Sequence, residues 1–252
     1  MVCISHTLTP LVFLLLITSQ VDSSTVLLDS ITFDKIIAKF KTAVIKFDIP
    51  YPYGEKHEEF QKVAKLATNS DLLMAEVGVN EFADKQNLDL AKRFAIIRDD
   101  FPVLLLFNNG NVENGIRYNG HYIADDIKRF VRYHSGIKIP LNMCLEELDV
   151  FAEQFMDQTI TNENRLELLE QTKQQMKQMT NEEHHKLAQI YVQIMEKILQ
   201  NGNVFIQNEI QRLNGIVLQK MTNEKRDQIK GKINILFSFV TTEQQSQQKS
   251  EL

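Results

Sequence analysis

Two cysteines are the residues of this 252-residue chain with the strongest potential for covalent chemistry. Cys3 lies in an apolar N-terminal segment and Cys144 lies near the middle of the chain. Dithiol exchange uses a Cys-x-x-Cys pair, and a helix N-terminus lowers the pKa of its first thiol. The sequence contains no such pair, so it excludes that chemistry. Removal of the N-terminal segment as a signal peptide would also remove Cys3 and leave Cys144 as a lone thiol.

The other candidates for catalysis or metal binding are weak. His184 and His185 are adjacent, so on a helix they point in different directions and form a poor metal pair. His57, His121 and His134 have no cysteine or acidic cluster at ligand spacing, and we expect them on the surface. No glycine-rich phosphate loop and no Gly-x-Ser-x-Gly motif occurs. We therefore predict no catalytic residue, no metal site and no cofactor.

The first part of the chain alternates between strand and helix patterns. Apolar runs predict strands at residues 26–28, 43–47, 72–79, 103–107 and 116–118. Helical spacing of apolar residues predicts helices at 30–40, 56–68, 88–94 and 123–133. The order βαβαβαββα is that of a thioredoxin-like α/β fold. Such a fold carries its reactive cysteines after the second strand, where this chain reads Asp48-Ile-Pro-Tyr-Pro-Tyr-Gly-Glu-Lys-His57.

The composition changes at Pro140. All five prolines lie at or before this position, whereas 17 of 20 glutamines follow it. Because proline interrupts helices and glutamine is tolerated in them, we predict a second, all-α domain of five helices. The predicted organisation is a signal peptide at 1–23, a thioredoxin-like domain without Cys-x-x-Cys at 24–136, a linker at 137–142, the helical domain at 143–241 and a flexible tail at 242–252.

Both ends of the chain carry features of targeting signals. Residues 1–21 contain no charged side chain, and the apolar run at 11–17 is too short to span a membrane but has the size of a signal-peptide core. The last four residues resemble the Lys-Asp-Glu-Leu retention signal: they are Lys249, Ser250, Glu251 and Leu252. Together they predict the endoplasmic reticulum lumen, with a retention receptor as one partner.

The charge balance limits the remaining partners. The chain has 28 basic and 33 acidic residues and no basic block, which argues against nucleic-acid binding. No apolar run besides the N-terminal one is long, so we expect no membrane insertion.

A binding surface is the function that the residues themselves favour. Tyr51 and Tyr53 alternate with prolines, including Pro52, and tyrosine offers a large contact area with little rotamer entropy to lose. Asp48 adds an anionic acceptor. Phe101-Pro102 precedes the predicted central strand, where thioredoxin-like folds carry a cis proline beside the active-site loop. We predict a client-binding or peptide-binding edge here; the alternative is that the tyrosines only cover a loop.

The same residues carry a resemblance to a known family. Residues 46–57 closely resemble the corresponding loop of the Windbeutel family, the redox-inactive protein-disulfide-isomerase-like chaperones of the endoplasmic reticulum. Further matches lie at residues 28–29, 77–79, 101–102, 191–199 and 234–236. The resemblance covers nearly the whole mature chain and implies a dimerising thioredoxin-like domain followed by a five-helix domain.

The resemblance also implies roles for individual residues. It places client contacts at Asp48, Tyr51 and Tyr53, and a homodimer edge at Leu28 and Asp29. It implies secretory client proteins as partners, in insects a Golgi glycosaminoglycan-type sulfotransferase that acts in dorsoventral patterning. We therefore predict a non-catalytic chaperone that aids the folding or export of its clients. The alternatives are a protein disulfide isomerase or thiol oxidoreductase acting through Cys144, and a purely structural scaffold.

Overall fold

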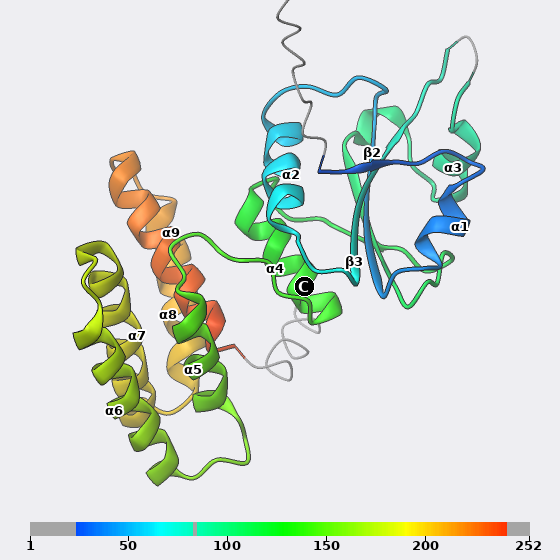
Figure 1. Ribbon diagram of the computed structural model, residues 1–252. Coiled ribbons are helices and arrows are strands. Elements are labelled where there is room, and N and C mark those ends of the chain that lie inside the picture. Colours follow the sequence, from blue (N-terminus) through cyan, green and yellow to red (C-terminus); the bar gives the residue numbers. More distant parts are fainter. Residues whose placement is uncertain (1–23, 83–84, 241–252) are drawn as a thin grey trace, which may run out of the picture.

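The computed structural model describes residues 24–82 and 85–240. The predicted signal peptide and the tail with its retention signal lie outside these residues. Figure 1 shows a mixed sheet with helices on both faces, followed by a separate group of helices. The predicted fold class is confirmed.

The first unit is built on a five-stranded sheet with the order β1-β3-β2-β4-β5. Strand β2 is central, parallel to β3 and antiparallel to β4, while β1 pairs parallel with β3 and β5 antiparallel with β4. The residues that follow β2 therefore lie at the C-terminal end of the central strand, between its two neighbours β3 and β4. The strands span Val26–Leu27, Thr42–Asp48, Leu72–Gly78, Val103–Asn108 and Ile116–Arg117.

Alternating side chains in these strands form two apolar layers. One face packs against α1 and α3, with Phe33, Phe47 and Phe107 in its core. The other packs against α2 and α4, with Val44, Phe60 and Leu104 in its core. Both faces of the central strands are thus covered, which explains their nearly unbroken apolar sequence. These helices span Phe33–Ile37 (α1), Leu88–Arg93 (α3), Glu55–Leu66 (α2) and Ala124–Ser135 (α4).

The second unit contains the five helices expected after Pro140. Three of them begin with a side chain that accepts a hydrogen bond from the backbone N–H three residues later, namely Thr161, Asn181 and Thr222. Their apolar faces share one core, in which Phe155, Tyr191 and Phe239 are fully buried. The helices span Glu146–Met156 (α5), Asn162–Gln178 (α6), Glu182–Asn201 (α7), Val204–Val217 (α8) and Asn223–Ser238 (α9).

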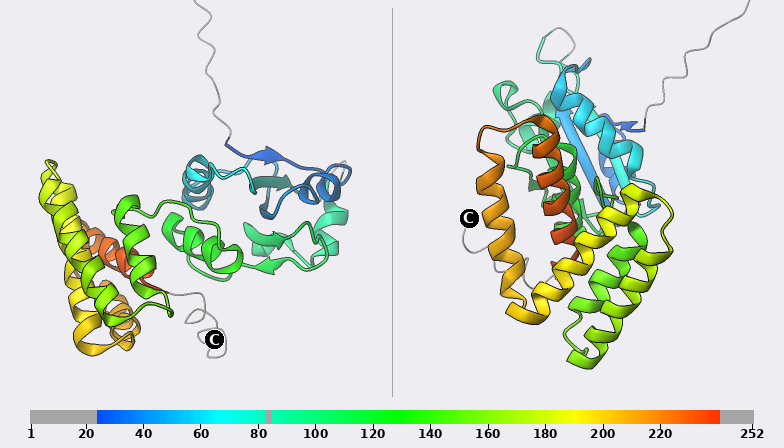
Figure 2. Two further views of the ribbon diagram at one scale, coloured as in Figure 1. Left: turned by 60° about the horizontal axis from the view of Figure 1, so that its bottom comes forward. Right: turned by 90° about the vertical axis from the view of Figure 1, so that its left-hand side faces the viewer.

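Helix α4 joins the two units. In the left view of Figure 2 it lies between the sheet and the helical unit. Asn234 of α9 is buried, donates to the Asp125 carboxylate over 2.7 Å and to the Asn142 carbonyl over 3.0 Å, and accepts from Arg129. The Arg129 guanidinium also lies 4.7 Å from the Phe237 ring centre. The contact between the units is therefore a polar network with specific partners.

A partly buried carboxylate connects three helices of the second unit. Asp149 of α5 accepts hydrogen bonds from the hydroxyls of Tyr191 on α7, over 2.6 Å, and Ser238 on α9. The Tyr191 oxygen in turn accepts from the Leu145 backbone N–H over 3.1 Å. Burial raises the pKa of Asp149 above its ordinary value. Glu209 shows the opposite effect, because hydrogen bonds from Arg212 and then Lys232 lower its pKa to about 2.

These two carboxyl groups should give opposite pH dependences of stability. Asp149 holds its proton more tightly when folded, so its contribution is present at acid pH and is lost as pH rises through the folded pKa. Glu209 contributes above its unfolded pKa of about 4.3 and loses that contribution as pH falls towards 2. Urea unfolding from pH 3 to pH 7 should therefore show Asp149→Asn gaining stability relative to wild type as pH rises, and Glu209→Gln losing it. Parallel pH profiles for the two variants would contradict this assignment.

Candidate functional site

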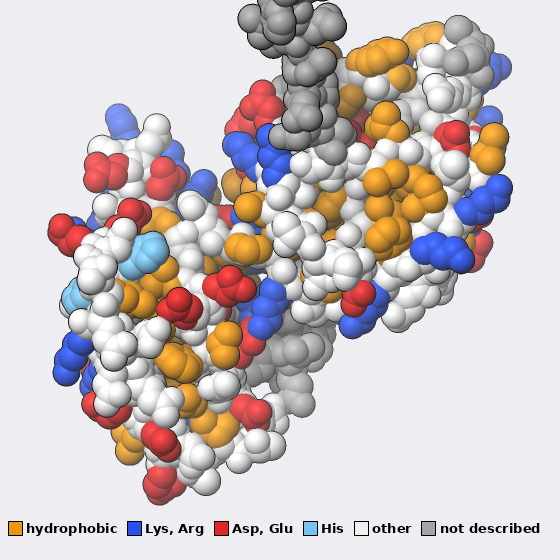
Figure 3. All heavy atoms as spheres, viewed as in Figure 1, with side chains coloured by type: hydrophobic (Ala, Val, Ile, Leu, Met, Phe, Trp, Pro, Cys, Tyr) orange, Lys and Arg blue, Asp and Glu red, His pale blue; other side chains and the backbone are white. Residues whose placement is uncertain are grey.

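The loop between β2 and α2 occupies the position where a dithiol site would lie. We call residues 49–54 the tyrosine loop. Tyr51 and Tyr53 are 88% and 84% exposed, so neither ring covers the core or the rest of the loop. Exposed aromatic rings with polar tips are suited to contacts with another polypeptide. Hydrophobic side chains also gather elsewhere on this domain, over the β1 and α1 side (Figure 3).

The sheet holds the start of the tyrosine loop closely. The Asp48 carbonyl accepts from the Val79 N–H over 2.8 Å, and its carboxylate accepts from the Ile49 N–H over 2.8 Å. Pro50 lies directly on Gly78: a side-chain Cβ at position 78 would lie 2.9 Å from the Pro50 Cα. Glycine is therefore required at position 78 for this close approach of two backbone segments.

The Phe101–Pro102 peptide bond is cis, as the sequence predicts. Tyr122 connects this segment to the start of α2: its hydroxyl donates to the Pro102 carbonyl, and the Lys56 ammonium lies 5.3 Å from its ring centre. Burial, and secondly the charge of Asp48, raise the pKa of Tyr122. The structure thus brings Pro102 and the first turn of α2 together at Tyr122, with the charge of Asp48 close enough to affect its pKa. The local sequence around Tyr122 gives no indication of these contacts.

A buried lysine lies beneath the loop. Lys46 of β2 is fully buried, and its ammonium lies 2.9 Å from the Glu76 carboxylate, 3.4 Å from that of Asp48 and 2.6 Å from Nδ1 of His57. The expectation that His57 is an ordinary surface residue is therefore wrong. A signal was present in the sequence, since Lys46 and Glu76 are opposite charges that interrupt two apolar strands, and the strand register pairs them directly.

The residues of the predicted dimer edge, Leu28 and Asp29, directly follow strand β1. Leu28 is buried in the core against α1 and α3, and the Asp29 carboxylate accepts from the N–H groups of Ile31 and Thr32. The exposed side chains of this edge belong to Val26 and Leu27 of β1 instead. A partner that docks here would therefore contact β1 rather than the Leu28 side chain.

Comparisons with known proteins agree with this architecture. Residues 21–142 match the family model for the ERp29 N-terminal domain, and residues 143–239 match that for the C-terminal domain of the endoplasmic reticulum protein ERp29. The chain belongs to the ERp29 family. It is also 32% identical over 216 residues to Protein windbeutel of Drosophila melanogaster, covering 84% of this chain and 83% of that protein. This confirms the resemblance to the Windbeutel family.

More distant relatives of this ERp29-family chain are disulfide isomerases. It is 26% identical over 231 residues to Protein disulfide isomerase-like 2-2 of Oryza sativa subsp. japonica, covering 88% of this chain but 60% of the rice protein. Among solved structures, the zinc-bound form of human ERp44 is 21% identical and has a TM-score of 0.35, covering 43% of this chain and 30% of that one. Family membership supports a chaperone-type role in the endoplasmic reticulum.

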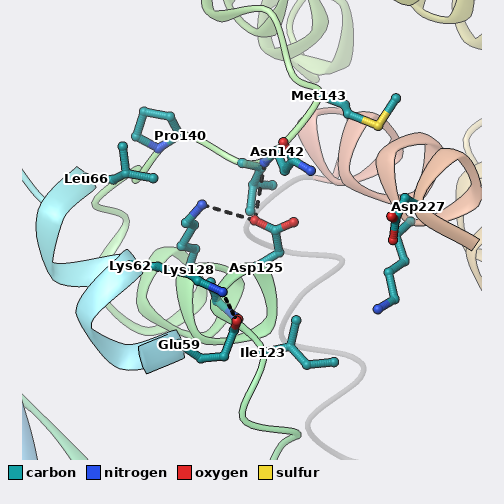
Figure 4. A pocket seen from close by; sticks show the side chains of 13 residues that line it. Glu59, Lys62, Leu66, Ile123, Asp125, Lys128, Pro140, Asn142, Met143 and Asp227 are labelled. Carbon is teal, nitrogen blue, oxygen red and sulfur yellow. Dashed lines mark hydrogen bonds and ion pairs between the residues drawn. The ribbon is translucent and has the colours of Figure 1, made fainter. Parts of the chain in front are cut away.

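A hollow of about 610 Å³ lies between α2, α4, the linker and α9 (Figure 4). Its charged side chains include pairs of opposite sign, Glu59 with Lys62 and Asp125 with Lys128, whose nitrogen lies 3.1 Å from the carboxylate. Such mutual neutralisation gives no strong preference for an anion or a cation.

Across residues 24–82 and 85–240, no group of three or more His, Cys, Asp or Glu residues could hold a metal ion. In the same ranges, no helix has the length and apolar character needed to cross a membrane.

Cys144 lies just before α5 and is partly buried. Its sulfur is 4.0 Å from the Ser238 hydroxyl. Burial, and secondly the charge of Asp149, raise the pKa of Cys144 to about 12. Reactive cysteines have the opposite property, a lowered pKa that supplies thiolate at neutral pH.

Cys144 should therefore react slowly in the folded protein. At pH 8, a pKa of about 12 gives on the order of a thousandfold less thiolate than the ordinary cysteine pKa of about 8.5. We expect iodoacetamide to modify Cys144 much faster in urea than under native conditions, as measured by mass spectrometry. Rapid native labelling, or insulin reduction that Cys144→Ser abolishes, would instead favour a thiol oxidoreductase.

Proposed function

We propose that this ERp29-family protein is a non-catalytic luminal chaperone that binds secretory clients through the tyrosine loop and aids their folding or export to the Golgi. The observation that carries the proposal is the exposure of Tyr51 and Tyr53 at the position where relatives with dithiol activity would present cysteines. The tyrosine loop occupies the position of a disulfide-exchange site but contains no cysteine. It retains the means to contact an extended polypeptide.

The surroundings of the loop support binding rather than chemistry. Asp48, Tyr122 and the cis Phe101–Pro102 segment lie around it, so aromatic, anionic and backbone polar groups converge at one edge. Aromatic side chains commonly provide most of the binding energy of a protein interface. The lone thiol, by contrast, lies in the other domain with a raised pKa.

The proposal includes the partners that the family resemblance implies. A homodimer would form through the β1 edge, where Val26 and Leu27 are exposed. A Golgi glycosaminoglycan-type sulfotransferase is the proposed client in an insect, with a role in dorsoventral patterning. The helical domain is proposed to contribute to client contact.

Removing one tyrosine ring should weaken client capture without unfolding the protein. Because the Tyr53 ring is exposed, Tyr53→Ala leaves the core intact and should lower affinity by about tenfold or more, which corresponds to about 1.4 kcal/mol. Crosslinking in the lumen followed by pull-down and quantitative mass spectrometry would measure the loss, together with arrival of the sulfotransferase in the Golgi.

A control accompanies this variant. Tyr53→Phe keeps the ring and should retain most capture. Unchanged capture and export for Tyr53→Ala would remove the loop from the mechanism. Dimers that capture no client at all would favour a structural scaffold.

The location of the protein has its own test. Deleting Lys249, Ser250, Glu251 and Leu252 should send the protein into the culture medium, because the retention receptor reads this terminal tetrapeptide. Replacing Ser250 with Asp, the usual residue of the signal, should preserve retention. Complete retention of the truncated chain would mean that the tetrapeptide is not read.

A further inference from the structure

The ammonium group of Lys46 lies in an unusual place for a charge. Its side chain projects from the central strand towards α2, none of its surface is exposed, and its nitrogen is 5.3 Å from the ring centre of Phe60. A buried ammonium is costly unless hydrogen-bond acceptors surround it. The positions of its acceptors therefore reveal what this charge holds in place.

Three acceptor groups surround the Lys46 ammonium. An ammonium group carries three donors and no lone pair. The three groups within reach are the carboxylates of Glu76 and Asp48, at 2.9 and 3.4 Å, and the Nδ1 atom of His57, at 2.6 Å. Since the ammonium can only donate, Nδ1 of His57 carries the lone pair that faces it.

These acceptors come from three different places in the fold. Asp48 is the last residue of β2 and directly precedes the tyrosine loop, whereas His57 lies in the first turn of α2, which follows the loop. Glu76 is a fixed point in β3, because its carboxylate also accepts from Gln61 over 2.6 Å and from Thr25 over 2.8 Å. One ammonium group thus connects the two ends of the loop to each other and to the sheet.

We propose that Lys46 is a positioning residue for the client-binding surface: by holding Asp48 and His57 together, it fixes the ends of the tyrosine loop and keeps the loop closed against β3. This inference rests on the proposed function for its biological consequence. The positioning itself is a property of the free protein. Loss of the ammonium group would leave Asp48 and His57 without a common partner and allow the loop to open.

The test compares variants that separate loop positioning from general stability. The main variant is Lys46→Met with Glu76→Gln, which removes the connecting donor without leaving Glu76 as an unpaired buried charge. Its matched control is Glu76→Gln alone, which disturbs the same buried pair but keeps Lys46 in contact with Asp48 and His57. A further variant, His57→Phe, removes one anchor at a position that is partly exposed and so does not depend on a change in the core.

Chymotrypsin cleavage at Tyr53–Gly54 measures opening of the loop in the purified full-length mature protein, since Pro52 blocks cleavage after Tyr51. Under conditions where urea unfolding shows every variant to be folded, we expect cleavage at least about tenfold faster in the double variant than in Glu76→Gln. His57→Phe should also be cleaved faster than Glu76→Gln. Equal rates in Glu76→Gln and the double variant, or in Glu76→Gln and His57→Phe, would overturn the inference.

Client capture by the same variants distinguishes this inference from the proposed function. Faster cleavage together with reduced capture supports both. Faster cleavage with unchanged capture supports the role of Lys46 and contradicts client binding by the loop. Unchanged cleavage overturns the role of Lys46, whatever happens to capture.

Discussion

A buried charge on the central strand of the sheet constrains the segments around it. Lys46 lies where its neighbours in sequence are core residues, and water cannot reach its ammonium group. Such a group is stable in the folded state only if the surrounding chain supplies acceptors at hydrogen-bond distance. Glu76, Asp48 and His57 meet this requirement from β3, from the end of β2 and from α2. The surface formed by the tyrosine loop depends on these buried contacts.

The position of the tyrosine loop follows from the strand order of the sheet. The loop after β2 lies at the middle of a sheet edge because β2 is central in the strand order. With Tyr51 and Tyr53 in this loop, the position presents aromatic surface rather than a nucleophile. Cys144 lies in the other domain, where burial and secondly the charge of Asp149 raise the pKa of its thiol.

The helical domain is attached through polar groups with specific partners. Asn234 receives and donates hydrogen bonds between α9, α4 and the linker, and Arg132 of α4 pairs with Glu153 of α5 over 2.8 Å. Polar contacts of this kind require particular geometry, so they favour one relative placement of the two domains.

Local sequence patterns were sufficient for the fold class, the five helices after Pro140 and the absence of a dithiol pair. Alternating apolar residues, helical spacing and proline placement depend on nearby residues, so they can be read without knowing the tertiary structure. The cis Phe101–Pro102 bond was also expected, from the thioredoxin-like order of elements.

Only the tertiary structure decided the contacts between distant segments. It placed His57 on Lys46, connected Tyr122 to Pro102, and turned Leu28 into the core while exposing Leu27. These outcomes depend on strand order, register and the packing of helices across the sheet. Hydrogen bonds between residues far apart in sequence cannot be predicted from local periodicity. The buried pair of Lys46 and Glu76 is a partial exception, because opposite charges within two apolar strands indicate that the strands pair there.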